Sequence, residues 1–298
     1  PCRHSLCLQR LGFKRCRHFG RHNAGYVVLK ARYIICFFCS GIFPVFFILA
    51  NIWYSVAKGE PPAAGKVAFE AVYLVILRKN GMIMKKVVII GASGFVGSAI
   101  LREALERGFR VTAIVRHPEK MTVRRLELEI VSGDVSDRQF LAGAVSGSDA
   151  VISAYNPGWR NPDIYRETLR VYPLIIRSVK EAGVRRLLIV GGAGSLYVAP
   201  GVRVMDRGVP EAFAPGVKGL AEVYYSYLIP EKELDWVLCS PAANLVPGER
   251  TRKFRLGKDD LIRSVSGESR ISVEDYAVAM IDELEKEMHH RERFTIGY

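Results

Sequence analysis

The spacing of hydrophobic residues divides the chain near residue 84. Val87-Val88-Ile89-Ile90 is a continuous apolar run, as in a strand buried on both faces of a parallel sheet. The next apolar residues recur at helical spacing: Val96, Ile100, Leu101, Ala104 and Leu105. This change from strand to helix spacing is the first of several, and it begins only after residue 84.

The same alternation continues through the rest of the chain. Further strands are predicted at 110–115, 126–130, 150–154, 186–190 and 236–239, and further helices at 165–179 and 220–227. Strands that alternate with helices predict an α/β fold, a Rossmann-type doubly wound parallel sheet. We expect residues 84–298 to form one domain.

Residues 1–83 have a different pattern. The 25 residues from 33 to 57 carry no charge and have aromatic residues at both ends, which is typical of a transmembrane helix. Residues 1–32 hold eight Lys or Arg and no acid, so this end would stay in the cytoplasm and all that follows the span would lie outside.

An outside location conflicts with the strand and nucleotide-binding turn that follow Met84, because nucleotide cofactors are found in the cytoplasm. The interpretation we prefer is a protein that starts at Met84 or Met82, with residues 1–83 a misassigned upstream extension. The alternatives are a genuine membrane anchor through residues 33–57, a buried apolar helix, or a cleaved leader.

Charge and cysteine content follow the same division. The net charge of +13 is +10 in residues 1–83 and +3 in residues 84–298, so the second part does not favour a nucleic-acid partner. Only Cys239 falls in residues 84–298, which suits a reducing compartment, and we expect a cytoplasmic protein. The early Cys and His residues lack the paired spacing of a zinc site, so no metal is predicted.

A glycine pattern follows the first strand: Gly91-Ala92-Ser93-Gly94-Phe95-Val96-Gly97. Gly91 would allow the tight exit from the strand, Gly94 the close approach of a pyrophosphate, and Gly97 the packing of helix on strand. The free N–H groups at the start of the helix would bind the phosphates. The pattern predicts a dinucleotide site.

The ends of the next strands refine this site. Arg116 stands where an acid would bind the ribose of NAD, so NADP(H) is preferred over NAD(H). Asp134 would accept from the adenine amino group and Val135 would pack on the ring. Ala154 and Tyr155 would lie along the cofactor towards the nicotinamide.

Six motifs in order resemble one family: 91–97, Gly133-Asp134-Val135, 190–197, 235–241, 247–251 and 271–277. They are similar to the atypical short-chain dehydrogenases/reductases, and most to an NAD(P)H-binding branch provisionally named NADH-flavin reductases. The resemblance spans residues 84–298. It implies a Rossmann fold, an NAD(P) cofactor and a small-molecule acceptor.

Most members of that superfamily use a Tyr-x-x-x-Lys pair to protonate a carbonyl. No tyrosine from 155 to 276 has Lys four residues later, and Ala214 stands four residues before Lys218. Reduced flavin does not need such an acid. The missing pair therefore favours a flavin reductase, with a redox sensor without turnover or an epimerase-dehydratase of sugar-nucleotide or steroid type as alternatives.

The remaining candidates come from the resemblance. Ser195 stands where the superfamily places an active-site serine, Tyr197 and Tyr155 would stack on an aromatic acceptor, and Lys218 would retain a ribose contact. Pro241 would line the nicotinamide pocket. The C-terminal part of the chain would build a substrate lid. Within it, residues 247–258 are rich in Arg and Lys and would either contact a flavin phosphate or be solvated.

Overall fold

The structure, a computed structural model, describes residues 85–298. The apolar stretch 33–57 and the alternative starts at Met82 and Met84 lie outside these residues, so the predictions made for them stay predictions. Among the helices of residues 85–298, none combines the length and apolar character that a membrane crossing requires.

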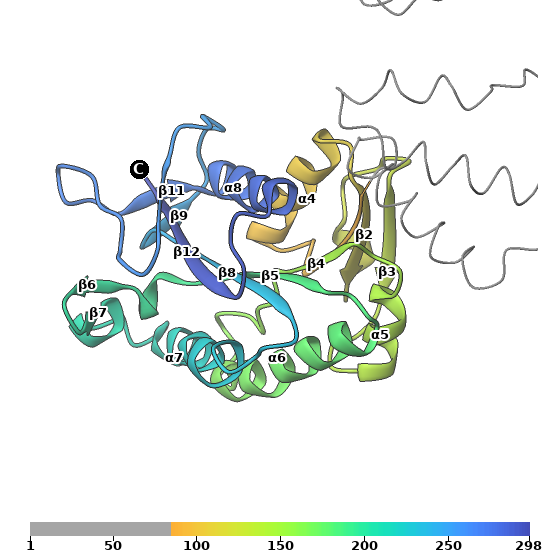
Figure 1. The fold of residues 1–298 in the computed structure, drawn as a ribbon, viewed down its shortest axis with the longest axis horizontal. Coiled ribbons are helices and arrows are strands. Elements are labelled where there is room, and N and C mark those ends of the chain that lie inside the picture. Colours follow the sequence, from red (N-terminus) through yellow and green to blue (C-terminus); the bar gives the residue numbers. More distant parts are fainter. Residues whose placement is uncertain (1–84) are drawn as a thin grey trace, which may run out of the picture. The chain divides into compact units, whose positions relative to one another are not determined.

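An eight-stranded sheet forms the centre of this part (Figure 1), with strand order β10-β12-β8-β5-β4-β1-β2-β3. Its strands are β1 (Lys86–Ile90), β2 (Arg110–Val115), β3 (Leu128–Ser132), β4 (Ala150–Ser153), β5 (Arg186–Val190), β8 (Asp235–Pro241), β10 (Arg255–Gly257) and β12 (Glu292–Gly297). All neighbours are parallel except β10 and β12. The predicted Rossmann-type parallel sheet is confirmed.

Helices cover both faces of this sheet (Figure 1). One face carries α4 (Phe95–Glu106) and α8 (Val273–Lys286), and the other carries α5 (Arg138–Val145), α6 (Ile164–Glu181) and α7 (Ala214–Val223). In β1, Val87 and Ile89 pack towards the first layer while Val88 and Ile90 pack towards the second. Burial on both faces explains the continuous apolar run of β1.

Short elements complete the described part. They are the 3-10 turns η2 (Pro118–Lys120), η3 (Ala193–Ser195) and η4 (Val204–Arg207), the π-helical turn η5 (Tyr224–Leu228), and the strands β6 (Tyr197–Ala199), β7 (Val202–Arg203), β9 (Asn244–Val246) and β11 (Arg270–Ser272).

Two predicted elements differ in extent. The strand expected from residue 126 begins at Leu128, because a turn in which the Leu128 amide donates to the Arg125 carbonyl precedes it. The helix expected from residue 220 already begins at Ala214, with Pro215 in its first turn, where a missing amide costs nothing.

Candidate functional site

The glycine loop lies at the carboxyl edge of the sheet, between the end of β1 and the start of α4. β2 and β4 flank β1, so the strand order reverses here, which is where open α/β sheets bind their ligands. The Gly91 amide donates to the Ile114 carbonyl of β2 at 3.1 Å, and the Gly94 amide donates to the Gly91 carbonyl at 3.0 Å. The loop is therefore folded by its own backbone.

Two glycines in this loop leave no room for a side chain. Gly91 has φ +78°, and a Cβ there would lie 2.7 Å from the Ala154 carbonyl oxygen. A Cβ at Gly97 would lie 2.1 Å from the Gly91 carbonyl oxygen. Both positions exclude every residue with a side chain, as the sequence predicted for a tight turn and for close packing of helix on strand.

The start of α4 offers unused amides. No side chain caps this helix at Gly94, and its first turn holds no acidic residue. The N–H groups at such an end, together with the helix dipole, attract an anion. The loop and the helix end therefore fit the pyrophosphate of a dinucleotide, with Gly91, Gly94 and Gly97 making the approach and Ser93 and Phe95 exposed beside it.

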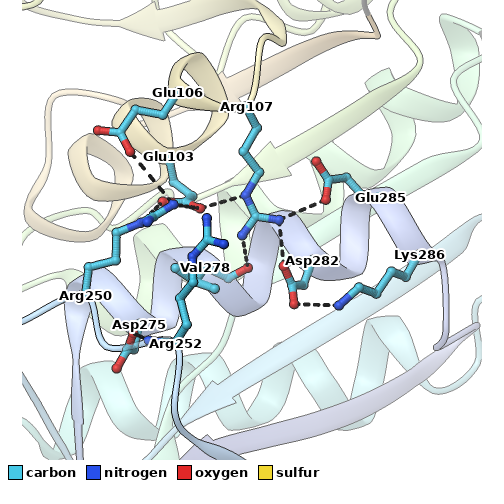
Figure 2. A network of polar contacts seen from close by, with 10 residues as sticks. All are labelled: Glu103, Glu106, Arg107, Arg250, Arg252, Asp275, Val278, Asp282, Glu285 and Lys286. Atoms are coloured by element: carbon cyan, nitrogen blue, oxygen red, sulfur yellow. Dashed lines mark hydrogen bonds and ion pairs between the residues drawn. The ribbon is translucent and has the colours of Figure 1, made fainter. Parts of the chain in front are cut away.

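The far end of α4 is fixed by a buried carboxylate (Figure 2). Glu103 is 3% exposed and accepts hydrogen bonds from Arg107 Nε at 2.6 Å and from Arg250 Nε and Nη2 at 2.6 and 2.8 Å. Burial opposes its charge, but the bonds from Arg250 and Arg107 outweigh burial and lower the pKa of Glu103. In the predicted lid, Arg250 thus binds a carboxylate of the cofactor helix.

Arg107 extends this contact to α8 (Figure 2). Its Nη1 donates to Asp282 at 2.6 Å and to Glu285 at 2.8 Å, and Nη2 donates to the Val278 carbonyl at 3.4 Å. The cofactor helix α4 is thereby joined to α8. This connection limits how far α4 can shift when a ligand binds at its N-terminus.

Ser272 and Asp275 have the spacing of a capping box, but α8 forms only one half of it. The Ser272 hydroxyl accepts from the Asp275 amide at 3.0 Å. The Asp275 carboxylate does not complete the box, because it accepts instead from the Thr251 hydroxyl at 2.5 Å and the Arg252 amide at 2.7 Å. Asp275 therefore fastens the predicted lid segment to α8.

The residues predicted to hold the adenosine end follow β2 and β3. Arg116 is exposed just after β2. Asp134 is exposed, and its carboxylate accepts from the Ser136 amide at 2.8 Å; this bond, with smaller contributions from Arg170 and Arg116, lowers the pKa of Asp134. Arg116 and Asp134 thus share one electrostatic environment. Val135 is buried in the core beneath α5 and α6.

The residues predicted beside the nicotinamide follow β4. The Ala154 amide donates to the Ile90 carbonyl at 2.9 Å, which places Ala154 directly beside the glycine loop. Burial, with the nearby Glu167, raises the pKa of Tyr155 to about 12, so its phenol stays protonated at neutral pH. The Tyr172 hydroxyl donates to the Tyr155 carbonyl at 3.1 Å.

The predicted catalytic residues occupy three different environments. Ser195 is 5% exposed, and its hydroxyl oxygen accepts from Nη1 of the buried Arg293 at 2.9 Å. Tyr197 lines a shallow hollow of about 330 Å³ with Tyr225 and the Arg203–Asp206 ion pair. Lys218 is exposed on α7. The turn η3, which holds Ser195, packs against α7, which holds Lys218.

The last predicted site residue is Pro241, and the histidines near the C-terminus raise the question of a metal. Pro241 is buried at the last position of β8, at the carboxyl edge. His289 and His290 bind carboxylates of Glu283 at 2.6 Å and Asp235 at 2.9 Å. Within residues 85–298 no group of three or more His, Cys, Asp or Glu is arranged to hold a metal ion.

Known proteins share this fold and loop. A family model described as NAD(P)H-binding matches residues 91–284. The Bacillus subtilis protein YwnB is 39% identical over 215 residues, 71% of this chain and 97% of its own length.

Two solved structures are similar over nearly their whole length. A Bacteroides thetaiotaomicron protein provisionally named an epimerase is 59% identical, with a TM-score of 0.69 over 72% of this chain and 98% of that one. A Streptococcus pneumoniae protein provisionally named an NADH-flavin reductase is 34% identical, with a TM-score of 0.63 over 72% and 99%. Together with the glycine loop at the point where the strand order reverses, these matches show that the chain belongs to the NAD(P)H-binding family of atypical short-chain dehydrogenases/reductases.

Proposed function

We propose that this protein is an NADPH-dependent oxidoreductase that passes hydride to a flavin or a similar planar acceptor. One observation carries the proposal: the chain has the glycine loop of a dinucleotide site, but α7 has Ala214 where the superfamily's proton-donating tyrosine would stand, four residues before Lys218. A carbonyl acceptor needs a placed acid as its oxygen gains charge, whereas reduced flavin takes its proton from water.

In this proposal the chain's residues bind and orient, and NADPH, when bound, supplies the hydride. The glycine loop holds the pyrophosphate, Arg116 binds the 2′-phosphate, and Asp134 accepts from the adenine amino group. NADPH is preferred to NADH because a guanidinium forms strong, bidentate bonds with a phosphate.

The residues nearer the reacting centre have proposed roles as well. Ala154, Tyr155 and Pro241 would line the nicotinamide end, and Lys218 would contact its ribose. Ser195 and Tyr197 would contact the acceptor. Of these two, Ser195 already accepts a bond from Arg293 and retains its own proton to donate.

The names of the relatives support two candidate reactions. The name of the Streptococcus pneumoniae protein supports transfer to flavin. The name of the Bacteroides thetaiotaomicron protein supports an epimerase, and its identity to this chain is higher. The absent Tyr-Lys pair weighs against the epimerase, because that reaction also needs a placed acid or base.

Optical assay of NADPH and NADH oxidation, with and without FMN, FAD or a quinone, tests the proposal. We expect flavin to accelerate loss of NADPH. Arg116→Ala should raise KM for NADPH by about 10-fold or more and leave KM for NADH unchanged, since one charge-assisted contact is worth about 1.5–3 kcal/mol. Lys120→Ala, an exposed cation nearby, is the matched control. Tight NADPH binding without oxidation by any acceptor would instead indicate a sensor.

A further inference from the structure

An aromatic pair stands at the rim of the carboxyl edge. Trp159 and Phe213 are 51% and 46% exposed, and their rings meet edge to face with centroids 5.4 Å apart. Single exposed apolar residues are common on protein surfaces and need no explanation. Here two large rings from segments distant in sequence are held against each other and left half open to solvent.

The chain makes room for this pair at a particular residue. A Cβ at Gly216, in the first turn of α7, would lie 2.7 Å from Cζ3 of Trp159 and 2.8 Å from Cδ1 of Ile164. The indole therefore rests on the backbone at the start of α7. A side chain at position 216 would displace the indole, so the glycine there allows Trp159 to pack against α7 while its other side stays exposed.

The loop that carries Trp159 is also held by its own bonds. The Asn156 side-chain oxygen accepts from the Gly158 amide at 2.7 Å, and the Asn161 amide donates to the Gly158 carbonyl at 3.0 Å. At its start, Ala154 lies against Gly91 and the Tyr155 carbonyl accepts from Tyr172. The segment 154–159 thus contacts the glycine loop at its first residue and carries the exposed indole at its last.

Both rings belong to the edge where the cofactor would lie. Trp159 follows β4, which is next to β1, and Phe213 comes between β5, which is next to β4, and α7. The parallel strands β1, β4 and β5 end at the same carboxyl edge. Phe213 directly precedes Ala214, the position where the superfamily's tyrosine would face its substrate. The rim at this point therefore offers two exposed aromatic rings, set perpendicular to each other, where a placed acid would otherwise stand.

We propose that Trp159 and Phe213 form the stacking surface for the acceptor's planar ring system, which stacks on one ring and meets the other, perpendicular ring edge to face. The inference rests on the proposed function, because it assigns the acceptor site of that reaction. An exposed aromatic surface favours a flat, conjugated acceptor over a small aliphatic carbonyl, since stacking rewards area and ring alignment. An open rim also lets oxidised acceptor enter and reduced acceptor leave, as a freely exchanging substrate requires.

The test measures binding of riboflavin to the full chain saturated with NADP⁺, by calorimetry. Riboflavin has the ring system without a phosphate, so surface arginines contribute little. We expect Trp159→Ala and Phe213→Ala to weaken riboflavin binding about 10-fold, with Trp159→Phe restoring most of it and NADP⁺ affinity unchanged. Tyr227→Ala removes an exposed ring from η5, beyond the opposite end of α7, and is the matched control.

The outcomes separate the acceptor site from the reaction. Equal riboflavin affinity in all variants, or no riboflavin binding at all, would overturn the stacking surface. If NADPH still reduces flavin with unchanged KM in Trp159→Ala, the stacking surface is wrong and the reductase stands. If riboflavin binds through the pair while no acceptor oxidises NADPH, the site stands and the reductase is wrong.

Discussion

The glycine loop and the aromatic rim lie at the same edge of one sheet but are built in opposite ways. At Gly91 and Gly97 the structure needs the absence of side chains, since a Cβ would meet backbone at 2.7 and 2.1 Å. At Trp159 and Phe213 it presents large side chains to solvent. In the proposed function, backbone amides bind the part shared by all dinucleotides, whereas side chains at the rim select the acceptor.

This difference predicts two separable effects of mutation. Changes in the glycine loop should abolish cofactor binding with every acceptor. Changes at the rim should leave cofactor binding intact and alter the choice of acceptor. The following variants test how far the two regions are independent.

The largest effect is expected from Gly97→Ala. The new methyl group would push α4 away from Gly91 and misplace the amides that face the pyrophosphate. We expect NADPH affinity to fall roughly 100-fold or more, since two charge-assisted bonds at about 1.5 kcal/mol each are lost. Calorimetry with NADPH measures this. Gly143→Ala in α5, where a Cβ would meet nothing within 4 Å, should bind NADPH normally.

A smaller effect, on stability, is expected from Glu103→Ala. Removing one partner of a buried ion pair costs about 3–5 kcal/mol, and we expect the low end because Arg250 is one-third exposed. Urea unfolding of the full chain measures the change. Glu106→Ala removes the exposed carboxylate 3.8 Å from the same arginine and should cost no more than about 1 kcal/mol. Equal costs would contradict the buried pair.

The same carboxylate predicts part of the acid dependence of stability. The folded-state pKa of Glu103 is lowered from its ordinary value of 4.5, so its contribution is present above that pH and is lost as the pH falls through the lowered value. Asp282, with its pKa also lowered, contributes in the same direction. Glu103→Gln should therefore flatten the acid side of the stability curve below about pH 4.5.

The positions Gly97 and Glu103 also show how much of the site could be predicted from the sequence. The tight turn and the close helix packing at Gly91, Gly94 and Gly97 can be predicted from the sequence, because the strand, the turn and the helix they join are neighbours in the chain. Of the two partners of Glu103, Arg107 is four residues away, but Arg250 is remote in sequence, and the basic run that holds it predicts a phosphate contact or a solvated surface. Spacing rules describe local structure and carry no information on which distant charges meet.

The same limit applies to the rim and to the last strand. Nothing in the pattern around Trp159 indicates that Gly216 supports its ring, because the contact joins the loop after β4 to the first turn of α7, which is remote in sequence. Phe294 and Ile296 alternate as in a strand, but β12 directly follows a charged segment and holds Glu292 and Arg293 itself, so its apolar pattern is weak. The Glu103–Arg250 and Trp159–Gly216 contacts are long-range, and periodicity describes only local structure.

Ser195→Ala tests whether a predicted catalytic residue belongs to either region. Its hydroxyl accepts from Arg293, whose guanidinium also lies 4.5 Å from the Tyr224 ring centre. If the serine contacts the acceptor, Ser195→Ala should lower kcat with flavin at unchanged NADPH affinity. If it only accepts from Arg293, we expect a loss of about 1–3 kcal/mol in stability and unchanged kcat. Steady-state kinetics beside urea unfolding separates the two.

The smallest effect is expected where the two regions meet. The Tyr172 hydroxyl donates to the Tyr155 carbonyl at the start of the segment that carries Trp159. Tyr172→Phe should cost about 0.5–1.5 kcal/mol in stability, the net value of one hydrogen bond. Because the glycine loop is folded by its own backbone bonds, NADPH affinity should not change. Riboflavin affinity should fall a few-fold, because the rim segment loses one of its restraints.

Tyr276→Phe supplies the matched control for this last change. Its hydroxyl donates to the Cys239 carbonyl at 2.8 Å from the opposite helix layer, so it removes the same kind of bond away from the rim. We expect a similar loss of stability in both variants and a loss of riboflavin affinity only in Tyr172→Phe. An equal loss of NADPH affinity in Tyr172→Phe would show that the rim segment and the glycine loop act as one unit. The separation of cofactor binding from acceptor choice would then fail.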